Sequence, residues 1–196
     1  MTLMAGGILL LSNNSNAWDL FSWMQCKIET LLFSGKISAG IVKMINPSLI
    51  VSYNYKFIIP DDVINLMNGQ IVNLHISLLP WNRGSSPNFW SFISNTPKGV
   101  TIHRVEKGLD TGEIIVQKEY FFDEKKETFG STYNTLQNGI VELFKENFNN
   151  ILSGNYLPYK QNGEGSYHTV RDMDEYLKDR QFSWDMNIYD FKNMEF

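Results

Sequence analysis

Three polar side chains recur at every second position in one short stretch, Asn73-Leu74-His75-Ile76-Ser77. In an extended strand, alternate side chains point to opposite faces, so the carboxamide, the imidazole and the hydroxyl share one face. If helices cover the sheet, each of these groups left unpaired costs about 1–3 kcal/mol. The stretch therefore indicates a satisfied internal network, a solvated edge or a polar cavity that could serve as a site.

A second segment, Gly108-Leu109-Asp110-Thr111-Gly112, places a carboxylate between two glycines. Glycine permits sharp backbone turns, so the segment could carry Asp110 inward toward His75. By its local chemistry alone the segment is more typical of an ordinary Asx turn between two strands, because Asp between glycines is common in turns. Both interpretations stay open until the elements that position the two segments are considered.

The surrounding segments alternate between strand and helix patterns. Apolar runs predict strands at 8–11, 28–33, 49–53 and 70–79, and apolar residues at helical spacing predict helices at 17–26, 37–45 and 61–67. Further along, the sequence predicts a helical turn at 89–93, strands at 99–105 and 113–122, and a long helix at 128–152. This alternation is typical of an α/β fold with a mostly parallel sheet flanked by helices, in which ligands bind beyond the carboxyl ends of the strands.

The length of 196 residues favours one full domain with a modest appendage. We predict a main domain over residues 1–152 and a C-terminal extension over 153–196 that packs on this domain or on a second copy of the chain, so a homodimer is left open. The loosely patterned residues 1–7 receive no role.

Bulk composition disfavours several classes of function. The formal net charge of -4 gives no long-range attraction for nucleic acid. Cys26 is the only cysteine, which excludes an internal disulfide and a paired-cysteine metal site, and this fits a reducing compartment. The apolar run 6–12 is too short to span a bilayer. We therefore expect a cytoplasmic protein that binds neither nucleic acid nor a membrane.

Beyond these patterns, several stretches resemble a known family when they are taken together. They are Asn73-Leu74-His75-Ile76-Ser77-Leu78-Leu79-Pro80, Arg83-Gly84, Ser86-Pro87, Gly99-Val100-Thr101-Ile102 and Gly108-Leu109-Asp110-Thr111-Gly112-Glu113-Ile114. Their order and spacing resemble the folate-dependent formyltransferase family, closely over about 70–115 and more loosely over about 8–152. The resemblance implies a Rossmann-like fold and N10-formyltetrahydrofolate as co-substrate.

The resemblance also implies the residues at the reacting centre, which map by motif onto Asn73, His75 and Asp110. Ile76 stands where the family often has a proline, which changes strand geometry without removing a reacting group. When an amine attacks the formyl group an oxyanion develops, and Asn73 and His75 could donate hydrogen bonds to it. Asp110 would favour the protonated imidazole and help to move the proton that the amine loses. This chemistry needs no metal and no covalent intermediate.

Further site residues follow from the same resemblance and from the chemistry of their side chains. The predicted cofactor-binding residues are Ser77, Leu78, Leu79, Arg83, Gly84, Leu109 and Thr111. The predicted substrate-binding residues are Asn13, Asn14, Tyr53, Asn54, Tyr55, Lys56 and Trp81, where Lys56 and the asparagines could hold a pyrophosphate and Tyr55 or Trp81 could stack a base. Strand packing is an equally good interpretation of the two tyrosines.

The amine that receives the formyl group is a separate question. Methionyl-tRNA formyltransferases carry an added domain and a basic surface, for which this chain has neither the length nor the charge. Glycinamide ribonucleotide formyltransferases have a glycine-rich loop after the first strand, where this chain has Ser12-Asn13-Asn14-Ser15-Asn16. The stretch 53–56 and the 81–83 loop resemble instead the sugar-nucleotide N-formyltransferases of bacterial O-antigen and surface-polysaccharide synthesis. We predict dTDP-4-amino-4,6-dideoxyglucose as substrate, with the purine-pathway enzyme type as an alternative.

Two other classes remain as rivals, a non-catalytic folate or nucleotide binder and a hydrolase that gives the formyl group to water.

Three further residues could invite a functional interpretation. We expect His103 to alternate outward on its strand and His168 to lie on a tail loop, both without a role. We expect Trp184 to pack on the body of the protein or on a partner.

Overall fold

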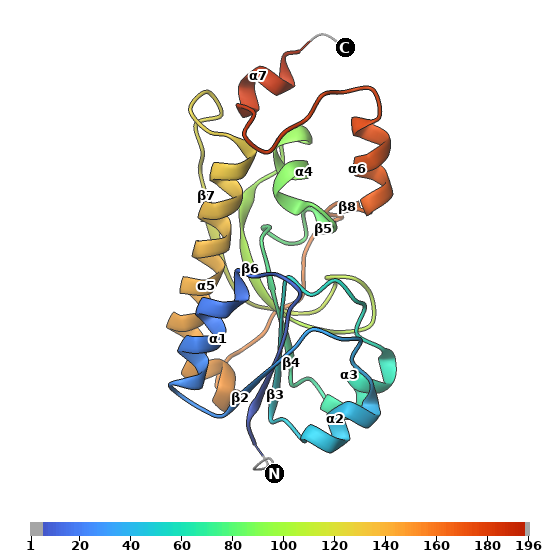
Figure 1. Ribbon diagram of the computed structural model, residues 1–196, viewed down its shortest axis with the longest axis vertical. Coiled ribbons are helices and arrows are strands. Elements are labelled where there is room, and N and C mark those ends of the chain that lie inside the picture. The colour runs from blue at the N-terminus through green and yellow to red at the C-terminus, as the bar shows by residue number, and fades with distance from the viewer. Residues whose placement is uncertain (1–5, 195–196) are drawn as a thin grey trace.

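In the computed structural model, which describes residues 6–194, a single six-stranded sheet forms the centre of the molecule (Figure 1). Its order is β2-β1-β3-β4-β6-β7. The strands are β1 (Ile8–Leu11), β2 (Thr30–Phe33), β3 (Leu49–Tyr53), β4 (Ile71–His75), β6 (Lys98–Arg104) and β7 (Ile114–Tyr120). The first four strands are parallel, whereas β6 runs antiparallel to both β4 and β7. The predicted α/β fold with a mostly parallel sheet is confirmed.

Helices cover both faces of this sheet. On one face lie α1 (Ala17–Gln25) and α5 (Phe129–Ser153), and on the other lie α2 (Ala39–Ile45) and α3 (Asp61–Met67). Within β1, Ile8 and Leu10 pack toward α1 and α5 while Leu9 and Leu11 pack toward α2 and α3, so the strand is buried on both sides. A continuous apolar run is the sequence pattern that such a strand requires.

Local sequence signals set the ends of several helices. The Ser38 hydroxyl accepts a hydrogen bond from the backbone N–H of Ile41 and caps α2. Thr128 and Ser131 form a reciprocal capping box at the start of α5, and Gly154 ends that helix in the left-handed conformation. None of the helices formed within residues 6–194 combines the length and the apolar character needed to cross a membrane.

The fourth strand is shorter than the sequence predicts, because β4 ends at His75 rather than continuing to residue 79. After His75 the chain turns, and the Ser77 hydroxyl donates to the backbone carbonyl of Trp81 at 2.7 Å. The Thr101 hydroxyl in turn donates to the backbone carbonyl of Ser77 at 2.6 Å. Val72, Leu74 and Ile76 share one core cluster, as the expected alternation requires, whereas Ser77 lies beyond the strand and serves the turn.

The segment after α5 contains regular structure that the sequence analysis did not predict. A short strand β8 (Tyr167–His168) pairs in parallel with β5 (Arg83–Gly84), and α6 (Val170–Leu177) and α7 (Ile188–Lys192) follow. These helices lie beside α4 (Pro87–Ile93) in Figure 1. Phe191 of α7 packs in an aromatic cluster with Phe89, Phe129 and Phe182. The division of the chain at residue 152 stays a prediction.

The aromatic cluster gives a test of how the tail is held. Phe191 is only 1% exposed, so Phe191→Ala should lower the free energy of unfolding by about 3–5 kcal/mol through lost burial and a residual cavity. Urea denaturation followed by fluorescence and circular dichroism would measure it. Phe121→Ala is the matched control, because that ring is 85% exposed and its loss should change stability by less than about 0.5 kcal/mol. Equal effects of the two substitutions would contradict the packing described.

Candidate active site

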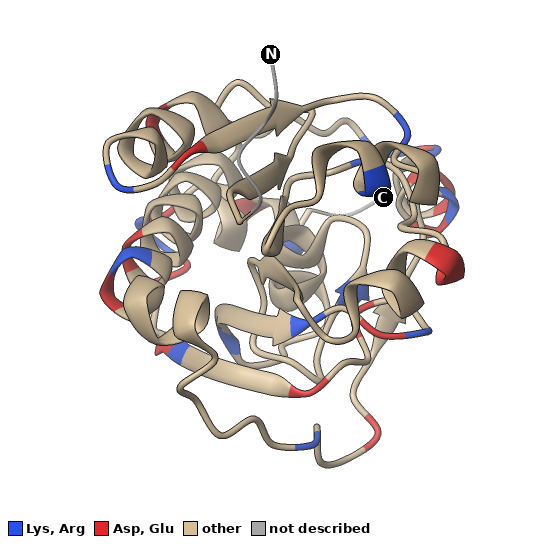
Figure 2. Ribbon diagram, turned by 90° about the horizontal axis from the view of Figure 1, so that it is seen from below, with Lys and Arg blue, Asp and Glu red and all other residues tan. Residues whose placement is uncertain are grey.

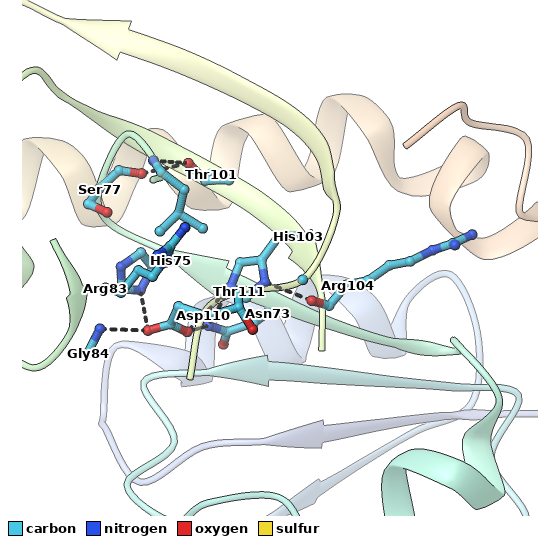
Figure 3. A network of polar contacts seen from close by, with 12 residues as sticks. Asn73, His75, Ser77, Arg83, Gly84, Thr101, His103, Arg104, Asp110 and Thr111 are labelled. Carbon is cyan, nitrogen blue, oxygen red and sulfur yellow. Dashed lines mark hydrogen bonds and ion pairs between the residues drawn. The ribbon is translucent and has the colours of Figure 1, made fainter. Parts of the chain in front are cut away.

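A cavity of about 580 Å³ opens beyond the carboxyl ends of β3 and β4. Its wall includes Asn73 and His75 from β4, His103 from β6, and Asp110 from the loop between β6 and β7. This is the edge where parallel α/β sheets bind ligands, and a volume of this size suits a small organic molecule. The two sequence segments that could carry chemistry therefore meet at one cavity, as Figure 3 shows.

His75 is held by hydrogen bonding at one ring nitrogen. Nε2 lies 3.1 Å from the backbone carbonyl oxygen of Asn82. Because a carbonyl oxygen can only accept, Nε2 carries the hydrogen, and in the neutral imidazole Nδ1 is then the basic nitrogen. Nδ1 lies 3.8 Å from Oδ2 of Asp110. A proton taken up at Nδ1 would therefore form an ion pair with this carboxylate.

Asp110 reaches the site from a strained turn. Its φ is 53°, in the left-handed region that non-glycine residues seldom adopt. Its Oδ2 accepts a hydrogen bond from the backbone N–H of Gly84 at 2.8 Å, and its Oδ1 accepts one from Nδ2 of Asn73 at 3.2 Å. The predicted convergence of Asp110 on His75 is what the geometry displays, although the catalytic roles of both residues stay a prediction.

His103 is part of this cluster, so the expectation that it points outward is wrong. It lies directly opposite Asn73 in the antiparallel pairing of β4 and β6, and only 2% of it is exposed. Its Nδ1 lies 2.8 Å from the backbone carbonyl of Arg104, so Nδ1 carries the hydrogen and a neutral ring can accept at Nε2. Nδ2 of Asn73 lies 3.2 Å from that Nε2. Alternation along the predicted strand 99–105 places Thr101 and His103 on the same face. Only the register of β6 against β4 shows that this face is the one that borders the site.

Asn73 links two other residues of the cluster. Its amide nitrogen has two hydrogens, and Asp110 and His103 each lie at hydrogen-bond distance from that nitrogen. Asn73 therefore couples the carboxylate of Asp110 to the imidazole of His103. The expected donation from Asn73 to an oxyanion stays a prediction.

The electrostatics favour a neutral His75 beside an ionised Asp110. Burial lowers the pKa of His75, and it outweighs the Asp110 charge that acts in the opposite direction. Burial raises the pKa of Asp110, but the neighbouring imidazoles and the Gly84 N–H together hold it well below its usual range. Asp110 does favour a protonated His75, as the sequence analysis expected, but desolvation of the His75 side chain, which is 8% exposed, is the larger effect on its pKa.

The predicted cofactor-binding residues divide between the cavity wall and the structure behind it. Gly84 and Leu109 line the cavity. The other predicted cofactor-binding residues lie off the wall that the described residues form; these are Ser77, Leu78, Leu79, Arg83 and Thr111. Several of them instead support the loops, since the Thr111 hydroxyl donates to the carbonyl of Lys107 and Leu79 accepts from Gln117. Their binding role stays a prediction.

The predicted substrate-binding residues divide in the same way. Asn54 and Tyr55 line the cavity. In the described part of the chain, the others lie off its wall; these are Asn13, Asn14, Tyr53, Lys56 and Trp81. The buried Tyr53 hydroxyl donates to Oε1 of Gln137 at 2.6 Å, and burial, followed by the proximity of Tyr133, raises its pKa. Packing, the alternative left open for this tyrosine, is therefore its observed environment.

The sequence analysis missed two groups of residues on the wall. An apolar group comes from the β3–α3 connection, from α3 and from the chain after β6; it comprises Phe57, Ile58, Ile59, Ile64 and Val105. A polar and aromatic group comprises Ser86, Asn88, Tyr133 and Trp184. Trp184 is 44% exposed and its ring lies 6.1 Å from that of Tyr133, so this tail residue also faces the cavity. The apolar run 57–59 before Pro60 was a signal that could have been used, whereas nothing local marks Trp184.

His168 also has a defined environment rather than a free loop position. Its ring stacks on that of Trp90, with centroids 4.1 Å apart and an angle of 6° between the planes. Burial lowers the pKa of His168 despite the nearby charge of Asp172.

Among residues 6–194, no group of three or more His, Cys, Asp or Glu side chains is placed to hold a metal ion.

Comparison with known proteins identifies the family. Residues 31–146 match the formyl transferase family. The formyltransferase PseJ from Anoxybacillus kamchatkensis, solved in complex with UDP-4,6-dideoxy-4-formamido-L-AltNAc and tetrahydrofolate, is 38% identical with a TM-score of 0.85; the alignment covers 94% of this chain and 96% of PseJ. A 4-N formyltransferase from Francisella tularensis, 24% identical over 92% of this chain and 84% of that one, shares the fold with a TM-score of 0.72. This chain belongs to the formyl transferase family.

Curated relatives with similar sequence are methionyl-tRNA formyltransferases. The one from Clostridium botulinum is 30% identical over 154 residues, which cover 78% of this chain and 48% of the relative. The one from Clostridioides difficile is 35% identical over 124 residues, or 63% of this chain and 40% of the relative. This chain thus spans half or less of the length of these relatives.

The charge arrangement at the cavity gives a second test. Asp110→Asn removes the negative charge that favours the imidazolium, so the pKa of His75 should fall further below its ordinary value of about 6.5. Titration of histidine labelled with ¹⁵N, followed by NMR, would measure the change.

Asp123→Asn is the control, because that carboxylate is exposed and pairs with Lys126 at the surface, so the pKa of His75 should not move. An unchanged or raised His75 pKa in Asp110→Asn would show that the carboxylate does not act on the imidazole.

Proposed function

We propose that this protein transfers a formyl group from N10-formyltetrahydrofolate to the amino group of a nucleotide-linked amino sugar. The observation that carries the proposal is the match to PseJ along nearly the whole of both chains, together with the convergence of Asn73, His75 and Asp110 on one cavity. The methionyl-tRNA formyltransferases match at lower identity and over half or less of their length.

We take the two groups of wall residues as two chemically different ends of the cavity. The apolar wall of Phe57, Ile58, Ile59, Ile64 and Val105 suits a flat, weakly polar ring, and we assign it to the pterin of the folate. When bound, the folate supplies an activated formyl group. Leu109 and Gly84 also line the cavity, and the Gly84 N–H donates to the Asp110 carboxylate, so we assign these two residues to the formyl-bearing arm.

The protein's own groups then handle the proton. The attacking amine forms a C–N bond to the formyl carbon and must lose a proton, which Nδ1 of His75 can accept because Nε2 is already protonated and held by Asn82. The imidazolium so formed is stabilised by the Asp110 carboxylate, whose Oδ2 lies 3.8 Å from Nδ1. The same proton can then pass to the folate nitrogen as its bond to the formyl carbon breaks, which leaves the products balanced.

The polar and aromatic end suits the sugar nucleotide. Tyr133 and Trp184 offer ring faces for a base, and Nδ2 of Asn14 lies 3.4 Å from the Tyr133 hydroxyl, which places one predicted substrate residue next to this end. Because PseJ was solved with a UDP-linked 4-formamido sugar, we propose a UDP-linked 4-amino-4,6-dideoxy sugar as the first candidate. The dTDP-4-amino-4,6-dideoxyglucose inferred from sequence is the second. A role in surface-polysaccharide synthesis would follow from either sugar.

The surface charge argues against an aminoacyl-tRNA as the substrate that receives the formyl group. Figure 2 shows Lys and Arg interspersed with Asp and Glu around the molecule rather than gathered on one side, and the formal net charge is -4. Recognition of nucleic acid depends on basic groups that neutralise phosphates. A pyrophosphate needs far fewer cations, so a sugar nucleotide fits this surface better.

A substrate panel tests the proposal. Purified protein is incubated with N10-formyltetrahydrofolate and, in parallel, with UDP- and dTDP-linked 4-amino-4,6-dideoxy sugars, glycinamide ribonucleotide and methionyl-tRNA. We expect a mass gain of one formyl group on a sugar nucleotide, with matching release of tetrahydrofolate. Formylation of the tRNA or of the ribonucleotide alone would overturn the sugar assignment, and release of formate without any formylated amine would indicate a hydrolase.

His75→Ala is the control for chemistry in this panel. Loss of the base should lower turnover by about 10²-fold or more while folate binding survives, since the lost interaction acts mainly in the transition state. Isothermal titration calorimetry with tetrahydrofolate would measure the binding. Folate binding without turnover in the unmodified protein, with any amine, would support the non-catalytic binder instead.

The assignment of the aromatic end makes its own prediction. Trp184→Ala should raise the KM for the sugar nucleotide by about tenfold, because stacking of a base on an aromatic ring contributes about 1–3 kcal/mol, and should leave kcat and the affinity for folate nearly unchanged. Trp18→Ala is the matched control, since that ring is also exposed but lies on α1, off the cavity wall. A change in folate affinity instead of KM would place the folate at this end.

A further inference from the structure

One carboxamide in the C-terminal segment ties together the two loops that form the site. Gln161 lies in the chain that joins α5 to β8, drawn in orange in Figure 1. Its Nε2 donates to the backbone carbonyl of Asp110 at 2.7 Å and to that of Gly112 at 2.9 Å. Its Oε1 accepts from Nε and Nη2 of Arg83 at 3.0 and 2.7 Å.

These four hydrogen bonds use the full capacity of the amide. A glutamine side chain has two hydrogens on nitrogen and two lone pairs on oxygen, and each is engaged here. The arrangement is also directional, because the carbonyl groups of the Asp110 loop require a donor and the guanidinium of Arg83 requires an acceptor. Few other side chains could satisfy both loops at once.

The residue that Gln161 holds has a backbone conformation that needs support from its surroundings. Asp110 has a φ of 53°, and a non-glycine residue in this region costs on the order of 1–3 kcal/mol unless its surroundings enforce it. The Gly84 N–H and Asn73 hold the carboxylate, but among the described residues the hydrogen bond from Gln161 is what engages the Asp110 carbonyl. Because Arg83 precedes Gly84, the same amide also positions the N–H that binds the carboxylate.

We propose that Gln161 is a positioning residue for formyl transfer, which acts by holding the Asp110 loop and the 83–84 strand at a fixed separation. The inference rests on the proposed function, since Asp110 matters only if His75 must accept a proton. Through Gln161, the C-terminal segment takes part in positioning the residues of the site. The segment's other attachments do not depend on this side chain, since Tyr159 pairs with Ile114 and Ser166 bonds to Pro80 through the backbone.

Two substitutions separate the proposed role from simple attachment of the tail. Gln161→Ala removes contacts to both loops. Gln161→Glu keeps an acceptor for Arg83 but turns a carboxylate toward the carbonyls of Asp110 and Gly112, which then lose their donor. We expect both variants to lower kcat by about tenfold or more, with the KM for the amino sugar changed less than about threefold, since misplacement of a reacting group mainly affects the chemical step. Thermal unfolding would show that both remain folded.

Asn162→Ala is the matched control, because this neighbouring side chain is exposed, and its kinetics should equal those of the unmodified protein. Full activity in Gln161→Glu would overturn the proposal, since contact with Arg83 would then suffice. Activity in Gln161→Ala within about twofold of the unmodified protein would overturn it as well.

A measurement without substrate separates this inference from the proposed function. The groups that act on the His75 imidazole are the Asp110 carboxylate, the ring of His103 and the Asn82 carbonyl. If the Asp110 loop loosens in Gln161→Ala, the carboxylate acts less on the imidazole and the NMR-determined pKa of His75 should fall, in the same direction as in Asp110→Asn. An unchanged His75 pKa would overturn the positioning role even if every amine in the panel proved inactive.

Discussion

The structure depends on the burial of one ionised carboxylate. Removing a carboxylate from water costs several kcal/mol, and the cost is recovered only if hydrogen bonds and opposite or polarisable groups surround it. Asp110, whose side chain is 10% exposed, accepts from Gly84 and Asn73 and faces two imidazoles. These partners come from three strands, β4, β5 and β6, so the strands must assemble around the carboxylate for the protein to fold with it inside.

The mixed sheet explains how these parts meet. Asn73 and His103 are directly paired because β6 runs antiparallel to β4, which places their side chains on one face at adjacent positions. The loop after β6 then returns across that face, and its left-handed residue turns the carboxylate back toward β4. A fully parallel sheet would have sent the chain through a helix at this point and could not have brought the Asp110 turn so close.

Much of the fold was predictable from sequence, and the reason is physical. Buried parallel strands need continuous apolar runs, and surface helices need an apolar stripe. The secondary structure of β1, β3 and α5 can therefore be predicted from the sequence of each element alone. The meeting of His75 with Asp110 was predictable only because their two motifs resemble those of a family. The role of His103 depends on strand register, and the end of β4 depends on a side-chain hydrogen bond between Ser77 and Trp81. A local sequence pattern predicts neither the role of His103 nor the end of β4.

The same limit applies to the cavity wall and to the charge state of the site. Trp184 lines the cavity, and the helix α7 that follows it packs in an aromatic cluster with residues distant in sequence, such as Phe89 and Phe129. No sequence pattern near Trp184 reveals these contacts. The charge state of His75 follows from a competition, in which burial exceeds the attraction of Asp110 and leaves the imidazole neutral. In the pair of His75 and Asp110, the resting charge therefore lies on the carboxylate. In the proposed reaction, a proton that reaches Nδ1 would meet a counter-ion already in place, so the surroundings would not need to reorganise while the charge develops.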